Sequence, residues 1–143
     1  MKYTKAEIKR TFIVKFEHND NFLDELNNLV KKENIKAGLI NFIGALKESE
    51  YVVGPKTNQL PPEPIFKKIE EPNELLGIGT IFWKDNEPKI HLHTGIGREN
   101  QVNIGCIRKN SKVFLIIEAI ILELETNAKR KYDEKTGLDL LDF

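Results

Sequence analysis

Two of the three histidines are the residues whose type and spacing could support metal chemistry. His91 and His93 flank Leu92, and they lie just upstream of the only cysteine, Cys106. In an extended strand, alternate side chains point to the same face, so the two imidazoles would stand about 6–7 Å apart at their bases. Two imidazoles at that spacing can converge on one ion when a third ligand arrives from elsewhere. Leu92 would point the opposite way into a core, on the face that Ile90 shares.

The length and the cysteine count set the first bounds. A chain of 143 residues predicts a single domain over residues 1–143 that needs no disulfide. One cysteine cannot form an internal disulfide, which favours a reducing, cytoplasmic location. The N-terminus lacks the apolar segment of a signal peptide, and no apolar run is long enough for a membrane span. We therefore expect no membrane partner.

The charge balance limits the nucleic acid hypothesis. Lysine plus arginine equals aspartate plus glutamate at 22 each, so the formal net charge is zero. Proteins that hold duplex DNA by releasing counterions usually carry a basic surplus, and this chain carries none. The abundance of lysine, glutamate and isoleucine suits a thermophile, including an archaeal one, or an AT-rich genome.

Apolar periodicity predicts a mostly β chain with one helix that must position these residues. In the first half we expect a strand at 8–16, an amphipathic helix at 22–30 that stops near Gly38, and strands at 39–43 and 48–53. A strand at 74–83 is joined by a hairpin turn at 84–88 to the histidine strand, and a turn at 95–100 leads to a strand at 101–107. A basic turn at 108–112, a long apolar strand at 113–124, a polar segment at 129–133 and a short element at 136–141 complete the chain. Small residues at 44–46 indicate a turn with close backbone approach. The long strand is apolar on both faces, which predicts a central position.

The segment from Gly54 to Asn73 contains five of the six prolines. Prolines at that density break regular structure, so we expect a long excursion over the surface. Loops of this length in small domains are often lids over a site, although some are only mobile.

One carboxylate stands out in the long apolar run. Glu118 would share a strand face with Ile116 and Ile120, and burying a lone carboxylate is costly unless it is paired or ligated. Its candidate partners are Arg10, Arg130, His91 and His93. The alternative is a bulge that lets Glu118 reach water.

The ordered motifs of the chain resemble the PPC (plants and prokaryotes conserved) domain family, in its stand-alone prokaryotic or archaeal form, over about residues 7–141. The residues that carry the resemblance are Arg10 at the start of a strand, Gly44-Ala45-Leu46, Glu74-Leu75-Leu76, Pro88-Lys89-Ile90-His91-Leu92-His93, Gly105-Cys106, Glu118, and Arg130 with Asp133 ahead of Thr136-Gly137-Leu138.

The resemblance implies an α+β fold with a highly curved antiparallel sheet and one main helix near the N-terminus, assembled as a homotrimer. It also implies a DNA-binding or transcription-associated role, because prokaryotic members are commonly described in this way. The AT-hook of the plant relatives, an Arg-Gly-Arg-Pro core, is absent from this sequence. No recognition-helix pattern is present either.

The chain departs from the family at one informative position. Many prokaryotic members have a third histidine where this chain has Cys106. Thiolate and imidazole both suit zinc, so His91, His93 and Cys106 would form a three-ligand zinc site with an open fourth position. The alternative is that the two histidines are hydrogen-bonded at a trimer interface and that Cys106 fills a small buried space.

Two classes of function follow. The first is a non-enzymatic module that associates with DNA, in which Arg108, Lys109 and Lys112, or Lys129 to Lys131, contact phosphates. The alternative, which the sequence favours, is that both clusters are solvated turns.

The second class is a metal-dependent enzyme or small-ligand binder with its site near the trimer interface. In this class Glu118 would orient the metal ligands or act as the catalytic base. Arg10 or Arg130 would hold a small anionic ligand.

Overall fold

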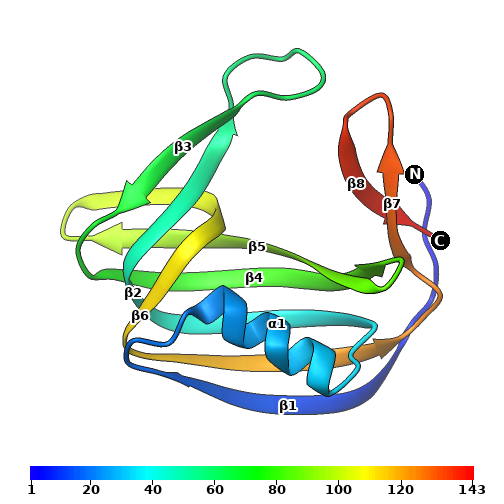
Figure 1. Cartoon of the computed structure of the whole chain (residues 1–143), viewed down its shortest axis with the longest axis horizontal. Helices are drawn as coiled ribbons and strands as arrows, with labels where there is room; N and C mark the ends of the chain where they lie inside the picture. Colours follow the sequence, from blue (N-terminus) through cyan, green and yellow to red (C-terminus); the bar gives the residue numbers. More distant parts are fainter.

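A strongly bent antiparallel sheet with one helix makes up the computed structural model, which describes residues 1–143 (Figure 1). In chain order the elements are β1 (Glu7–Glu17), α1 (Phe22–Lys32), β2 (Ala37–Pro55), β3 (Pro64–Ile69), β4 (Asn73–Lys84), β5 (Glu87–Arg98), β6 (Gln101–Glu125), β7 (Lys129–Asp133) and β8 (Leu138–Asp142). The main sheet has the order β1-β6-β5-β4-β2-β3, and β6 also pairs with β2. The strands β2, β4, β5 and β6 thus form a closed ring of pairings, and the predicted α+β class with a curved antiparallel sheet is confirmed.

The helix forms where the three- and four-residue spacing of apolar side chains predicts it. Phe22, Leu26 and Val30 are fully buried against the sheet. The helix ends with Glu33 as its C-cap, and Asn34 takes a left-handed conformation at φ 52°. Gly38 lies inside β2 and does not end the helix, so the predicted stop signal is wrong. This is the only helix of the chain, and it is too short to cross a membrane.

Two predicted turns, at 44–46 and at 108–112, are wrong because strands β2 and β6 continue through these residues. Gly44 stands within β2 at φ 142°, and a Cβ there would meet the Ile116 carbonyl oxygen and lie 2.7 Å from the Ile117 Cα. Glycine therefore lets β2 bend closely against β6 without interrupting the strand. Likewise, the basic segment 108–112 belongs to β6, which continues from Gln101 to Glu125.

The proline-rich excursion is shorter than predicted. Residues Pro64–Ile69 form β3, which pairs with the end of β2. The longer stretch without strand structure is residues 56–63, and its Pro61 lies 3.2 Å from where a Cβ on Gly137 would be. The loop therefore approaches the turn that joins β7 to β8.

The two faces of the main sheet differ in exposure. Strand pairing places Ile13, Ile120, Asn41, Ile78 and His93 in one row from β1 across to β5. Ile13 is 90% exposed, and Ile120 and Ile78 are about half exposed. We call this side of β1, β6, β2 and β4 the outer face. It presents apolar side chains to the surroundings, and the row that begins at Ile13 leads to His93 on β5.

Candidate metal centre

Strand β5 presents both histidines on one side, as their spacing predicts. Leu92, between them, is 1% exposed and packs opposite Gly79 of β4. A Cβ on Gly79 would collide with the Leu92 side chain, so the glycine makes room for that leucine. Because Leu92 is fixed in the core, His91 and His93 must point to the other side of the strand.

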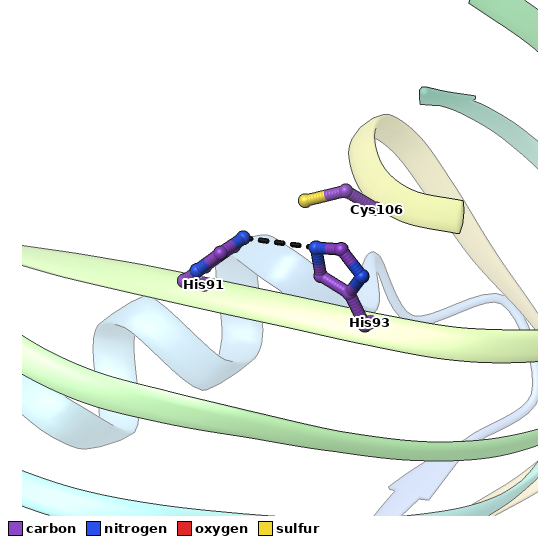
Figure 2. Close-up of side chains that lie close together, drawn as sticks. All are labelled: His91, His93 and Cys106. Atoms are coloured by element: carbon purple, nitrogen blue, oxygen red, sulfur yellow. Dashed lines mark hydrogen bonds between the residues drawn. The ribbon is translucent and has the colours of Figure 1, made fainter. Parts of the chain in front are cut away.

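The third donor comes from β6. Cys106 pairs in register with His93, and its sulfur points toward the gap between the two imidazoles (Figure 2). The Nε2 atoms of His91 and His93 lie 3.0 Å apart, and the three potential ligand atoms all lie within 4.8 Å of one another. The candidate zinc ligands named from the sequence are therefore brought together by two neighbouring strands.

This geometry fits a zinc ion with small side-chain adjustments. Zinc–nitrogen bonds of about 2.1 Å and zinc–sulfur bonds of about 2.3 Å place tetrahedral ligand atoms about 3.4–3.6 Å apart. The two Nε2 atoms, 3.0 Å apart, are slightly closer than this tetrahedral separation. The widest separation between ligand atoms, up to 4.8 Å, is about 1 Å larger than it. Rotation about the side-chain bonds covers such differences without moving the backbone.

The local environment sets the protonation of these groups. Partial burial lowers the pKa of His91, and the nearby His93, Arg130 and Arg108 lower it further. Burial raises the pKa of the Cys106 thiol, against a smaller opposing effect of Arg108. The imidazole is thus held in its neutral, ligating form, whereas zinc binding would have to displace the thiol proton.

Glu118 does not share the buried face of β6. It is exposed and pairs in register with Lys15 and Ile43, on the outer side of the strand. The buried side of β6 carries the odd-numbered residues of this stretch, such as Ile117 and Ile121, so the expected burial of Glu118 is wrong. Glu118 does reach water, as the alternative expected, but it does so from the outer side of a regular strand pairing and not through a bulge. Glu118 is not part of the histidine and cysteine cluster, and a catalytic role has no geometric support.

The buried carboxylate of the strand is Glu123, which is 4% exposed. Its oxygen accepts a hydrogen bond from the Arg10 Nε, and Arg10 also donates to the Glu33 backbone oxygen at 2.7 Å. This explains why an arginine stands in β1, because a buried carboxylate needs a cationic partner. Arg10 is already engaged with two glutamates and lies outside the metal cluster.

Arg130, by contrast, lies beside the candidate metal centre. Its Nη2 donates a hydrogen bond to the Thr80 hydroxyl at 3.1 Å. Thr80 of β4 is the residue that pairs with His91 of β5. It lines a cavity of about 690 Å³ between α1, β5, β6 and the β7–β8 hairpin, together with His91 and Arg108. Of the two arginines suggested as anion ligands, Arg130 therefore faces a cavity next to the metal cluster.

The basic cluster 108–112 is divided by its strand geometry. Arg108 lines the cavity, whereas Lys109 and Lys112 pair with Glu50 and Glu48 of β2. Acidic cross-strand neighbours reduce the local positive potential that a phosphate backbone would require. The second cluster forms β7, where Lys129 and Lys131 are exposed and Arg130 is half-buried.

Sequence reasoning missed three cavity residues. Asp139 of β8 forms ion pairs with Lys84 at 2.6 Å and with Lys89 at 3.7 Å. Neighbouring Lys84 makes the pKa of the Asp139 carboxyl lower than usual. The pairing of β7 with β8 and its packing against β4 link residues that are far apart in the chain, and no local pattern indicates this contact.

Comparisons with known proteins agree with the fold. The sequence matches the profile of the Plants and Prokaryotes Conserved (PCC) domain over residues 3–125. A search of curated proteins found no match.

Among solved structures, a metal-containing protein from Archaeoglobus fulgidus has a TM-score of 0.85 at 25% identity, covering 98% of both chains. A plant- and prokaryote-conserved (PPC) protein from Pyrococcus horikoshii has a TM-score of 0.85 at 27% identity, covering 100% of this chain and 98% of the other. A Bacteroides thetaiotaomicron protein named "putative DNA binding protein" has a TM-score of 0.82 at 24% identity, covering 96% of this chain and 97% of the other.

The profile match spans most of the chain, and the fold is shared along nearly its full length. The profile match covers the quoted motifs from Arg10 to Glu118. The chain belongs to the plants and prokaryotes conserved domain family.

Proposed function

We propose that this protein is a zinc-binding member of the family, with the ion held by His91, His93 and Cys106. The observation that carries the proposal is the convergence of three donors from two strands, with all ligand atoms within 4.8 Å of one another. The donor types support zinc, since imidazole and thiolate together suit that ion better than calcium or magnesium. The name of the Archaeoglobus neighbour, a metal-containing protein, lends further support.

Three protein ligands leave a fourth position open, and zinc bound in this way supplies a Lewis acid. The chain contributes the geometry. Leu92 and Gly79 fix β5 so that both imidazoles face outward, and the register with β6 places the sulfur beside His93. A site that has an open position and borders a cavity suits binding or conversion of a small ligand, which we propose in preference to a purely structural zinc.

Metal analysis of untagged protein tests the proposal. We expect about one zinc per chain, and loss of that zinc in the double variant His91→Ala, His93→Ala without unfolding. The matched control is His18→Ala, which removes the third histidine. The His18 Nδ1 accepts a hydrogen bond from the Leu115 backbone N–H at 3.0 Å and lies outside the cluster. Full zinc retention in the double variant would contradict the assignment.

We also propose that the protein assembles as a homotrimer through the outer face. Ile13 and Leu76 are more than two-thirds exposed there, and a soluble monomer rarely leaves such a row of large apolar side chains uncovered. His93 pairs with Ile78 of this face, so the metal centre would lie close to the contact between copies. Light scattering should give a trimer mass, and Ile13→Asp combined with Ile78→Asp should give a monomer. A wild-type monomer at all concentrations would contradict the proposal.

DNA association is the second candidate, because structural neighbours from Bacteroides thetaiotaomicron and Ralstonia eutropha carry DNA-binding names. Its contacts would come from Lys129 and Lys131 of β7, or from Arg108 with Lys109 and Lys112. The zero net charge and the pairing of Lys109 and Lys112 with glutamates weigh against strong binding. A gel shift on random duplex at increasing salt tests it. Binding that weakens steeply with salt would support this function.

A further inference from the structure

Two of the four arginines form no ion pair, and both line the same cavity. Arg10 pairs with Glu33 and Glu123, and Arg98 pairs with Glu71. Arg108 and Arg130 form no ion pair, and the Arg108 side chain forms no hydrogen bond within the chain. Arg130 is half-buried and donates only to a hydroxyl and, at 3.5 Å, to a backbone carbonyl. The charge of Asp139 acts on Arg130, but no carboxylate oxygen occupies the donors of either guanidinium. Such donors at a cavity wall are well suited to an external anion.

The charge of the whole cavity points the same way. Its lining includes Lys84 and Lys89 in addition to the two arginines, and Asp139 is its single carboxylate. Both lysines already share that carboxylate. Four cationic side chains against one acidic group leave a surplus of three positive charges. This surplus is large for a protein whose overall net charge is zero, and it favours a dianion over a monoanion.

The size and the remaining lining indicate an organic ligand. A cavity of about 690 Å³ is much larger than an inorganic anion needs, and falls in the range of small-molecule sites. Apolar side chains of β5, β6 and β8 form part of its wall, among them Ile90, Ile107 and Leu138. His91 belongs both to this wall and to the metal cluster, so a ligand bound here would extend to the metal centre.

We infer that the cavity binds a small phosphate monoester, with its phosphate between Arg108 and Arg130, its organic part against Ile90, Ile107 and Leu138, and one end directed toward His91. The placement of that end next to a metal rests on the function proposed above, whereas the anion site itself depends on the two arginines. Arginine pairs bind phosphate oxygens through parallel N–H donors, which gives orientation as well as affinity. The open metal position would then face the bound ester.

Calorimetric titration of the zinc-loaded protein with phenyl phosphate tests the inference, with phenol as the neutral analogue. We expect phenyl phosphate to bind and phenol to bind far more weakly. Arg108→Ala and Arg130→Gln should each weaken phenyl phosphate binding at least about tenfold, which corresponds to about 1.4 kcal/mol. Glutamine is chosen at position 130 because it keeps a hydrogen-bond donor for the Thr80 hydroxyl, which helps to hold the β7–β8 hairpin against β4.

The matched control is Lys109→Ala. Lys109 follows Arg108 on β6 but pairs with Glu50 and does not line the cavity, so its loss should change the affinity less than twofold. Zinc content should stay the same in all three variants. Absence of phenyl phosphate binding, or equal binding by both arginine variants and wild type, would overturn the anion site while leaving the zinc proposal intact.

If the wild type holds no zinc, the same titration of the metal-free protein decides the anion site alone. Binding that still requires both arginines supports it, and binding that does not overturns it.

Discussion

Removal of a single imidazole should remove most of the zinc-linked part of the stability while leaving the apoprotein nearly unchanged. His93 is exposed, and its ring packs edge-to-face on His91 with the ring centroids 4.8 Å apart. Truncating such a surface side chain in His93→Ala should alter the unfolding free energy of the metal-free protein by no more than about 0.5 kcal/mol. Any larger loss in the presence of zinc therefore reports metal binding.

The magnitude follows from ligand linkage. At a free zinc concentration 100 times the dissociation constant, binding to the folded state alone adds about 2.7 kcal/mol. For a chain of this size, about 3 °C of melting temperature accompanies each kcal/mol, which predicts a rise of about 8 °C for the wild type. If loss of one ligand weakens affinity about 100-fold, the same zinc concentration stabilises His93→Ala by only about 0.4 kcal/mol.

Differential scanning calorimetry with chelator and with zinc, at one fixed protein concentration, measures both quantities. His18→Ala should keep the full zinc-dependent rise, although its own baseline falls because the Leu115 N–H loses its acceptor. The reasoning would be refuted if His93→Ala kept the wild-type rise, or if His18→Ala lost it.

Three further predictions concern the scaffold. Gly44→Ala should destabilise the protein by at least about 3 kcal/mol in urea unfolding, because residue 44 has a positive φ and the new methyl group would collide with the backbone of β6. The control is Gly54→Ala, where φ is similar but no atom lies within 4 Å of the new Cβ, and the loss of stability should be clearly smaller. Arg10→Ala should lower the melting temperature more than Lys9→Ala, since only Arg10 donates a hydrogen bond to the buried Glu123, whereas Lys9 is 3.9 Å away; equal losses would contradict this assignment. The Asp133 carboxyl has a lowered pKa because it accepts hydrogen bonds from the Thr136 hydroxyl at 2.7 Å and from the Thr136 backbone N–H at 2.8 Å. Its stabilisation of the β7–β8 turn is therefore complete above the unfolded pKa of about 3.9 and is lost as the pH falls through the lower pKa of the folded state. The Thr136 amide NMR signal should titrate below about pH 3.9, and Asp133→Asn should abolish that titration.

Local patterns sufficed for much of the fold. The alternation around Leu92 predicts the side on which both histidines stand, and the spacing of Phe22, Leu26 and Val30 predicts the helix. These features depend on neighbours within one element, where the side-chain period is fixed by backbone geometry. The family resemblance supplied the curved antiparallel sheet and indicated Cys106 as the third candidate ligand.

Long-range features were harder to predict. The buried side of β6 could not be assigned from its sequence, because both sides of the run from Val113 to Leu124 are apolar and the choice depends on which side faces α1. Leu115 takes a left-handed conformation at φ 60°, a backbone irregularity that no local pattern signals. The wrong side was chosen for Glu118 for this reason, and Glu123 was overlooked. The cavity was missed because four separate segments of the chain form it.

The two-residue connection between β4 and β5 has a consequence for how such a protein could change. Lys84 pairs with Glu87, so only Asp85 and Asn86 lie between the strands, and Asp85 takes the left-handed conformation at φ 51°. A one-codon insertion here would shift the register by one residue and turn every side chain of β5 to the opposite side. Leu92 would then emerge while both imidazoles entered the interior, so a relative could lose the site with all three donor residues still encoded.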